Sequence, residues 1–244
     1  MALNLKSYLN YLSTWITTYV KTSHTNGIIL GISGGVDSAL VANIAALSHK
    51  IKVVGVWMDI DNSSLDLQCV KALRQQKHFE IIDVPLLKQF QNHVQLLKLT
   101  KPAALANLKA RLRAITLYAL AQEHNLLVAG TGNADEAYMG YFTKFGDGAA
   151  DILPIVHLTK KRVFESAKLL NVPSIITQRA PSASLYKDQT DESEMGVAYE
   201  SIDAYLNFKK IKTHDQLIIE RFHKNNQHKF SMPVQPKAFE KIRK

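Results

Sequence analysis

The sequence predicts an α/β fold of three layers, α/β/α, in which helices cover both faces of a parallel sheet of about five strands. Two observations lead to this prediction. Short runs of 4–7 residues, apolar at nearly every position, recur along the chain, as is typical of strands buried on both faces. Segments with helical spacing of apolar residues separate these runs, and such alternation is typical of parallel sheets.

The elements follow one another in a regular order. The predicted helices cover residues 5–20, 36–46, 65–76 and 102–123, since their apolar residues recur every three or four positions or follow a Gly-Gly or Pro start. The predicted strands cover residues 28–32, 52–58, 79–84 and 126–129. Two further short apolar stretches, at 152–156 and 175–176, are expected between helices.

Composition narrows the class of protein. A chain of 244 residues with 46% hydrophobic residues suits one generous domain with a sizeable core. No apolar run reaches the length that crosses a bilayer, and no leader pattern opens the chain. The single cysteine, Cys69, excludes an internal disulfide and fits a reducing compartment. We therefore expect a cytoplasmic protein without a membrane partner.

The net charge of +9 suits a polyanionic ligand. Nucleic acid and phosphate-rich small molecules fit this charge equally well. A composition that is basic throughout explains the excess just as well, so charge alone does not separate these interpretations.

Three polar loops directly follow predicted strands, at residues 33–38, 59–63 and 130–136. In open parallel sheets, ligands bind beyond the carboxyl ends of the strands. We therefore expect the functional site at these loops. For Asp59 and Asp61, an ordinary polar loop is the favoured interpretation over a metal or ribose contact.

The segment GISGGVDS, residues 31–38, carries the clearest chemical signal. Gly34 and Gly35 leave backbone amides open to a ligand at the start of a helix, where partial positive charge favours phosphate. Ser33 and Ser38 add hydroxyl groups. Asp37 would repel phosphate by itself, but it suits a magnesium ion that bridges carboxylate and phosphate oxygens. A lone Gly-Gly would favour a simple turn with a helix cap, whereas the whole segment after a strand favours a phosphate site.

The same segment lacks the lysine of the kinase-type phosphate loop and instead resembles the PP-loop signature of ATP pyrophosphatases. Four longer blocks, at residues 107–113, 130–154, 181–185 and 196–206, resemble the NAD synthetase family. The block FTKFGDGAADILP within them is the most specific. The resemblance implies a Rossmann-like, adenine nucleotide alpha hydrolase-like fold, a homodimer, and one synthetase domain over residues 1–244 without a glutaminase domain.

The resemblance also implies roles for individual residues. Magnesium would be held by Asp37 and Glu136. Contacts to ATP would come from Gly31, Ile32, Ser33, Gly34, Gly35, Val36, Asp37, Ser38, Thr131, Lys160 and Ser182. Contacts to deamido-NAD would come from Arg111, Lys144, Asp151, His228 and Lys229. The catalytic residues would be Lys160, beside the reacting phosphate, and Asp147, as the acceptor of a proton from ammonia or equally as a turn residue.

Three positions qualify the match. Phe230 stands where the family usually has arginine after His228-Lys229, which removes one anionic contact. Val36 replaces a frequent glutamine and is expected to face helix packing. Arg113 lies two residues beyond Arg111, on another face of the helix, and is interpreted as structural.

The expected activity is ATP-dependent amidation of deamido-NAD with ammonia through an adenylated intermediate, giving NAD, AMP and pyrophosphate, with Mg²⁺ as cofactor. Its partners would be these substrates and a second copy of the chain, with no nucleic acid. Two alternatives remain at this stage: another PP-loop ATPase, such as a tRNA lysidine synthetase, and a non-catalytic nucleotide-binding protein.

Overall fold

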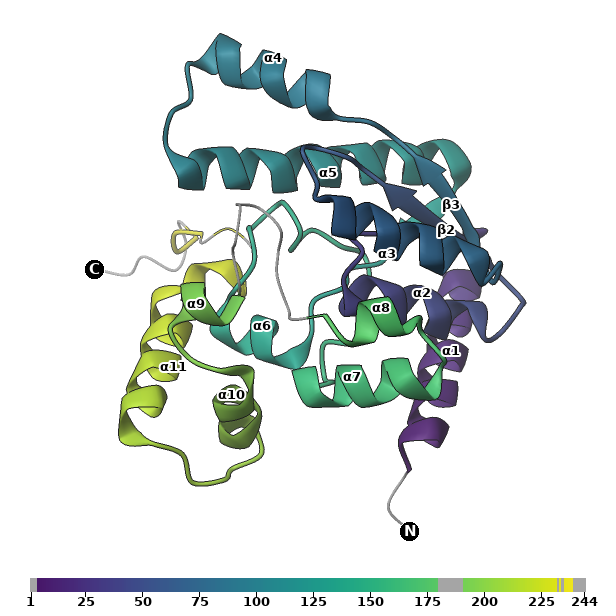
Figure 1. Cartoon of the computed structure of the whole chain (residues 1–244). Coiled ribbons are helices and arrows are strands. Elements are labelled where there is room, and N and C mark those ends of the chain that lie inside the picture. Colours follow the sequence, from purple (N-terminus) through teal and green to yellow (C-terminus); the bar gives the residue numbers. More distant parts are fainter. Residues whose placement is uncertain (1–3, 180–190, 232, 234, 239–244) are drawn as a thin grey trace.

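A computed structural model describes residues 4–179, 191–231, 233 and 235–238. Its centre is a sheet of parallel strands in the order β3-β2-β1-β4. Figure 1 labels β2 and β3 of this sheet. The strands are β1 (Gly27–Gly31), β2 (Lys52–Trp57), β3 (Glu80–Asp83) and β4 (Leu126–Val128). A parallel bridge from Ala129 to Ile152 extends the sheet beyond β4. This agrees with the prediction of about five parallel strands, the fifth being reduced to one bridge.

Helices lie in the intervals between the strands and follow one another after β4. They are α1 (Leu5–Thr22), α2 (Val36–Ala46), α3 (Ser64–Gln75), α4 (Leu87–Leu97), α5 (Pro102–His124), α6 (Ala134–Met139), α7 (Lys160–Leu169), α8 (Ser174–Thr177), α9 (Asp191–Met195), α10 (Tyr199–Leu206) and α11 (Thr213–Asn225), with a 3-10 turn, η1, at Gln227–Lys229.

Successive residues of β1 pack into two separate cores, because side chains of a strand point alternately to opposite faces. Ile28 and Leu30 belong to the core formed with α1, α2 and α7. Ile29 belongs to the core on the other face, which α5 covers with Leu112. Every residue of α2 except Asp37 is buried. These two cores confirm the predicted α/β/α layering.

Two segments differ from the sequence-based expectation. No element was expected between residues 85 and 101, yet α4 lies there. None of its residues is fully buried; the helix packs against α5, with half-buried Phe90 packed against the core. Ile175 and Ile176 were expected between helices, but they lie within α8, which begins directly after Pro173.

A third, smaller core lies at one end of the sheet. It joins α6, α9, α10 and α11 around Met139, Met195, Ile202 and Ile219 (Figure 1). Helix α10 also packs against α7, and α7 packs against α2. The smaller core is therefore connected through α7 to the loop that follows β1.

The sheet topology places a crevice at the ends of β1 and β4. The chain passes from β1 to β2 and β3 on one side and then returns to β4 on the other side of β1. Loops that leave β1 and β4 therefore diverge, which is where ligands bind in such sheets. Among the described residues, no helix has the length and apolar character to span a membrane.

Candidate active site

The loop after β1 places backbone amides at the start of α2. Gly34 has φ +83°, and a Cβ there would lie 2.9 Å from the carbonyl oxygen of Asp66, so only glycine fits without strain. Gly35 is the N-cap of α2, and its N–H donates to Ser33 Oγ at 3.1 Å. Ser38 Oγ donates to the Gly35 carbonyl at 3.1 Å. The loop thus presents a helix N-terminus, a favourable site for phosphate.

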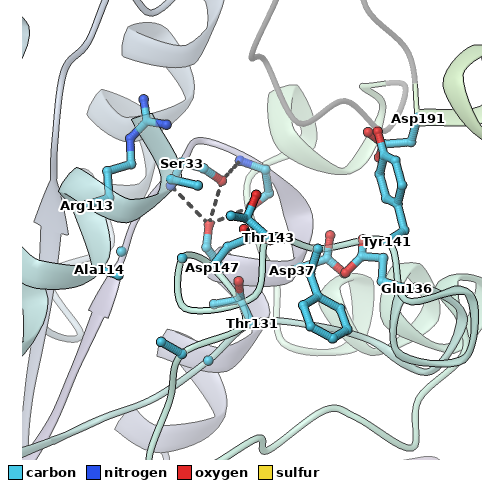
Figure 2. Close-up of a pocket in the computed structure, with 18 of the residues that line it drawn as sticks. Ser33, Asp37, Arg113, Ala114, Thr131, Glu136, Tyr141, Thr143, Asp147 and Asp191 are labelled. Carbon is cyan, nitrogen blue, oxygen red and sulfur yellow. Dashed lines mark hydrogen bonds between the residues drawn. The ribbon is translucent and has the colours of Figure 1, made fainter. Parts of the chain in front are cut away.

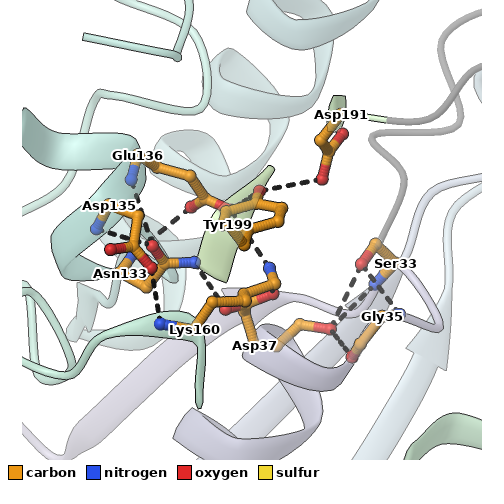
Figure 3. Close-up of polar contacts among 10 residues, drawn as sticks. Ser33, Gly35, Asp37, Asn133, Asp135, Glu136, Lys160, Asp191 and Tyr199 are labelled. Atoms are coloured by element: carbon orange, nitrogen blue, oxygen red, sulfur yellow. Dashed lines mark hydrogen bonds and ion pairs between the residues drawn. The ribbon is translucent and has the colours of Figure 1, made fainter. Parts of the chain in front are cut away.

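An ion-pair cluster lies beside this loop. Lys160 Nζ, at the start of α7, lies 2.6 Å from Asp37 Oδ2 of α2 and 3.3 Å from Glu136 Oε1 of α6 (Figure 3). Burial by itself lowers the pKa of Lys160, but Asp37 and Glu136 outweigh burial and raise it. The lysine is therefore a permanent cation between two carboxylates.

Helix α6 begins with a capping box that orients Glu136. Asn133 Oδ1 accepts from the N–H groups of Asp135 and Glu136, and Glu136 Oε2 accepts from the N–H of Asn133. Asn133 Nδ2 also donates to Asp37 Oδ1 at 2.9 Å. Burial raises the pKa of Glu136 to about 7; Lys160 opposes this rise, and repulsion by Asp37 adds to it. The motif Asn-x-x-Glu thereby links the two carboxylates.

The chemistry of this cluster suits magnesium. Asp37 and Glu136 are hard oxygen donors that converge on one cation, here the ammonium of Lys160. Among the described residues, no group of three or more His, Cys, Asp or Glu side chains could hold a metal alone. Mg²⁺ commonly binds through one or two carboxylates with water and phosphate oxygens. The residues present therefore fit a magnesium ion that arrives with a triphosphate.

A cavity of about 620 Å³ joins this cluster to the loop after β4. Figure 2 shows Ser33, Asp37, Thr131, Glu136 and Asp147 around it. Of the predicted site residues, those that line the cavity are Gly31, Ile32, Ser33, Gly35, Val36, Asp37, Ser38, Thr131, Glu136, Asp147, Lys160 and Lys229. Its size is within the usual range of ligand sites.

Asp147 and Lys229 also line the cavity. Asp147 Oδ1 accepts from the N–H of Thr143 at 2.9 Å, and burial raises the pKa of its carboxyl. Lys229 Nζ donates to the carbonyls of Gly140 and Phe142, each at 2.8 Å. Asp147 therefore lines the cavity and also stabilises its own turn, while its role as a proton acceptor stays a prediction.

Four residues expected to contact deamido-NAD do not line this cavity. Three of them lie together on its exposed rim: Arg111 donates to the Lys144 carbonyl at 3.4 Å, and Lys144 Nζ donates to the carbonyl of His228. Asp151 lies apart, where its Oδ2 accepts from the N–H of Val128 at 2.7 Å. Of the two remaining residues, Gly34 belongs to the loop after β1 but does not line the cavity, and Ser182 lies outside the described residues.

Comparison with known proteins establishes the family. A sequence model described as NAD synthase matches residues 8–241. The chain belongs to the NAD synthase family. It is 44% identical over 247 residues to an NH(3)-dependent NAD(+) synthetase of Mesoplasma florum, covering 98% of this chain and 100% of the relative. This confirms the family that four sequence blocks indicated, and it does not favour a tRNA-modifying enzyme.

Solved structures of the family share the fold. An NMN synthetase from Francisella tularensis superposes with a TM-score of 0.92 at 37% identity, covering 97% of this chain and 100% of that one. An NH3-dependent NAD synthetase from Campylobacter jejuni, in complex with the nitrate ion, gives 0.80 at 27% identity with the same coverage. The NAD synthase fold therefore extends over nearly the whole chain.

Several residues of this NAD synthase family member were given no place in the site from sequence, yet they line the cavity. Arg113 donates to the Met58 carbonyl at 3.3 Å and to Asn62 Oδ1 at 3.2 Å, so it is both structural and exposed to the cavity. Arg179 lies 2.5 Å from Asp66 Oδ1 and follows α8. Its position just before the block at residues 181–185 was the one sequence feature that could have indicated a place for Arg179 in the site. No spacing rule pointed to Asp191.

Proposed function

We propose that the chain catalyses the ATP-dependent amidation of deamido-NAD with ammonia to give NAD, AMP and pyrophosphate. The observation that carries the proposal is the convergence of Asp37, Glu136 and Lys160 beside an amide-rich loop. It occurs in a chain that is 44% identical, over its whole length, to an NH(3)-dependent NAD(+) synthetase. The enzyme is thus a ligase that forms a carbon–nitrogen bond.

The β- and γ-phosphates of ATP suit the loop at residues 31–38. Amides at the start of α2 and the hydroxyls of Ser33 and Ser38 can donate to phosphate oxygens, and the helix dipole favours their charge. The ammonium of Lys160 would face the reacting phosphorus, where it stabilises the negative charge that develops during transfer. Asp37 and Glu136 would hold Mg²⁺, which supplies charge neutralisation on the phosphate oxygens.

The reaction then has two steps. The carboxylate of deamido-NAD attacks the α-phosphorus, the bond to the bridging oxygen breaks, and pyrophosphate leaves with that electron pair. Ammonia attacks the carbonyl of the acyl-adenylate, AMP leaves, and the nitrogen loses a proton. Asp147 is the proposed acceptor of that proton, which its position on the cavity wall and the raised pKa of its carboxyl support.

The rim cluster of Arg111, Lys144 and His228 would bind the dinucleotide together with Lys229 and Asp151. Cationic groups there suit its phosphates. We further propose a homodimer, which the exposed apolar side chains Leu96, Leu97 and Ile115 on α4 and α5 support. A cytoplasmic location is proposed as well, in keeping with Cys69 as a buried free thiol.

A second candidate function is the same amidation on a mononucleotide, from nicotinic acid mononucleotide to NMN. The specific observation is the TM-score of 0.92 with an NMN synthetase from Francisella tularensis, against 0.80 for the NAD synthetase from Campylobacter jejuni. Phe230, at the position where a cation would suit a further phosphate, fits the smaller substrate as well.

One experiment tests both candidates. The purified chain is given ATP, Mg²⁺ and ammonium with either deamido-NAD or nicotinic acid mononucleotide, and kcat/KM is measured for each. The main proposal expects NAD and AMP in equal amounts and the higher kcat/KM for the dinucleotide. A higher value for the mononucleotide supports the second candidate. Cleavage of ATP to ADP, or binding of ATP without any amide product, rejects both.

A further inference from the structure

Helix α7 begins at Lys160 without a cap of its own. Its N-cap, Thr159, makes no side-chain cap hydrogen bond, and its first turn contains no acidic residue. The first N–H groups of a helix have no partner inside the helix and must find one elsewhere. The groups that accept hydrogen bonds from these N–H groups therefore determine where α7 begins and where the backbone of Lys160 lies.

Two aspartates from other helices fill this role. The N–H of Lys160 donates to Asp135 Oδ2 of α6 at 2.5 Å, and the N–H of Lys161 donates to Asp203 Oδ2 of α10 at 3.2 Å (Figure 3 shows the first). Acidic groups at a helix N-terminus also interact favourably with the helix dipole. The start of α7 is thus attached to two elements of the smaller core.

The burial of both aspartates argues that this contact is specific. Asp135 is 0% exposed and Asp203 is 9% exposed. In the described part of the chain, Oδ1 of each meets no hydrogen-bond donor. An exposed cap would stabilise a helix at far lower cost in desolvation.

The ammonium end of Lys160 is held from the same side. Tyr199 and Asp203 lie four residues apart on α10, so they share one face. The Tyr199 ring centroid lies 4.9 Å from Lys160 Nζ. Its hydroxyl lies 3.0 Å from Asp191 Oδ2 and 3.3 Å from Glu136 Oε1, within hydrogen-bond distance of both carboxylates (Figure 3).

We propose that Asp135, Asp203 and Tyr199 are positioning residues that together hold Lys160 against the ATP site. Asp135 and Asp203 fix its backbone, and Tyr199 fixes the surroundings of its ammonium. The proposal rests on the role in ATP binding proposed above for Lys160. None of the three residues is required to touch substrate, because each acts through Lys160 or Glu136.

The first test compares ATP affinity in two helix-cap variants. Asp203→Ala is expected to weaken MgATP binding roughly tenfold, as loss of a supporting residue commonly does. Asp203→Asn retains an oxygen acceptor for the Lys161 N–H and should restore most of the affinity. The control is Asn4→Ala, which removes a side-chain cap from α1, where Asn4 accepts from the Ser7 N–H at 2.8 Å. It should lower the melting temperature but leave ATP affinity unchanged.

A double-mutant cycle separates positioning from general destabilisation. Calorimetric titration with MgATP needs no turnover, so Lys160→Ala can be measured even if it is inactive. If Asp203 acts through Lys160, the double variant binds MgATP no more weakly than Lys160→Ala alone. Two losses of affinity that simply multiply would overturn the proposal. If Asp203→Ala fails to fold, Tyr199→Phe, which removes one hydroxyl, enters the same cycle with the same expectation.

Kinetics provide an independent check. The KM for ATP should rise in Asp203→Ala while the KM for the acid substrate stays within about twofold, because the rim cluster is untouched. Equal rises in both constants would contradict the proposal. If wild-type protein forms no amide product, the proposed function fails instead. If wild type is active and Asp203→Ala and Tyr199→Phe match it, only the positioning role fails.

Discussion

The ATP end of the cavity and the rim beside the cavity are built differently. At the ATP end, Asp37, Glu136 and Lys160 each stand in the first turn of a helix, are largely buried, and bond to one another through side chains. On the rim, Arg111 and Lys144 are more exposed and use backbone carbonyls as partners. Side chains in a first turn are placed by the helix that carries them. Those on the rim depend on how the segment after α11 rests on the loop after α6.

This difference separates the two substrates. The ATP end is organised by the fold itself, because its donors and charges already face one another. The rim takes its shape from one chain segment contacting another. We therefore expect substitutions at the ATP end to change catalysis sharply, and substitutions on the rim to change mainly the affinity for the acid substrate.

The largest effect is expected for Asp37→Ala. It removes a proposed magnesium ligand and one partner of Lys160, so turnover should fall by about 10³-fold or more. Product formation is measured at saturating Mg²⁺ and ATP. Asp83→Ala is a suitable control, since Asp83 is an exposed carboxylate at the end of β3. A near-normal rate for Asp37→Ala would contradict the expectation that substitutions at the ATP end affect catalysis more than those on the rim.

Arg179→Ala tests the buried ion pair beneath the phosphate loop. Asp66 is fully buried; burial raises the pKa of its carboxyl, but hydrogen bonds from Arg179 and Ser63 outweigh burial and lower it. Removal of the guanidinium should lower the free energy of unfolding by about 3–5 kcal/mol. Urea denaturation near pH 7 measures this loss. Arg162→Ala breaks the exposed pair with Glu165 and should cost less than about 1 kcal/mol.

The pH dependence of the same pair has a definite sign. Because the pKa of folded Asp66 lies below its unfolded value, the pair contributes stability above the unfolded pKa. That contribution is lost as pH falls through the folded pKa. In Arg179→Ala the pKa of Asp66 rises, so stability should begin to fall at a higher pH than in the wild type. Identical acid-unfolding curves would show that Arg179 does not set the ionisation of Asp66.

A smaller and more selective effect is expected for Arg111→Ala. Loss of a rim cation should raise the KM for the acid substrate about tenfold and leave the KM for ATP unchanged. Initial rates at varied concentrations of each substrate distinguish the two constants. A rise confined to the KM for ATP would indicate that Arg111 acts at the ATP end and would contradict its assignment to the rim.

The smallest effect is expected for Lys144→Ala. Its ammonium bonds to the carbonyls of His228 and Ser231, so its loss should loosen the segment after α11. The KM for the acid substrate should rise about two- to threefold, the size of a net hydrogen bond. Lys224→Ala, on the neighbouring α11, is the comparison variant. Equal effects of both variants would indicate a general influence of charge.

Much of the fold follows from local patterns, and the reason is burial. Strands β1, β2 and β4 are largely apolar because helices cover both of their faces, so each is visible as a run in the sequence. At the edge of the sheet, β3 retains the half-buried pair Ile81 and Ile82 between exposed Glu80 and Asp83. Helix α4 was missed because none of its residues is fully buried. The loop at residues 31–38 was identifiable because its chemistry resides in the backbone and in consecutive residues.

The remaining parts of the site depend on tertiary packing. Arg111 and Arg113 differ in direction on α5, and only the rotation of that helix against the sheet decides which one lines the cavity. Lys160, Tyr199 and Glu136 are far apart in the sequence and meet where α7 packs against the smaller core. No rule of sequence spacing predicts contacts among residues that are so far apart. The family resemblance supplied Lys160 and Glu136, whereas Tyr199 emerged from the structure.

The division of the molecule into separate cores has a consequence for its stability. Asp37 is carried by a helix of the large core, whereas Glu136 and Tyr199 are carried by helices of the small one. The polypeptide chain is the one covalent connection between these two cores. If a low concentration of denaturant unfolds the smaller core first, the enzyme should lose its activity while most of the sheet is still folded.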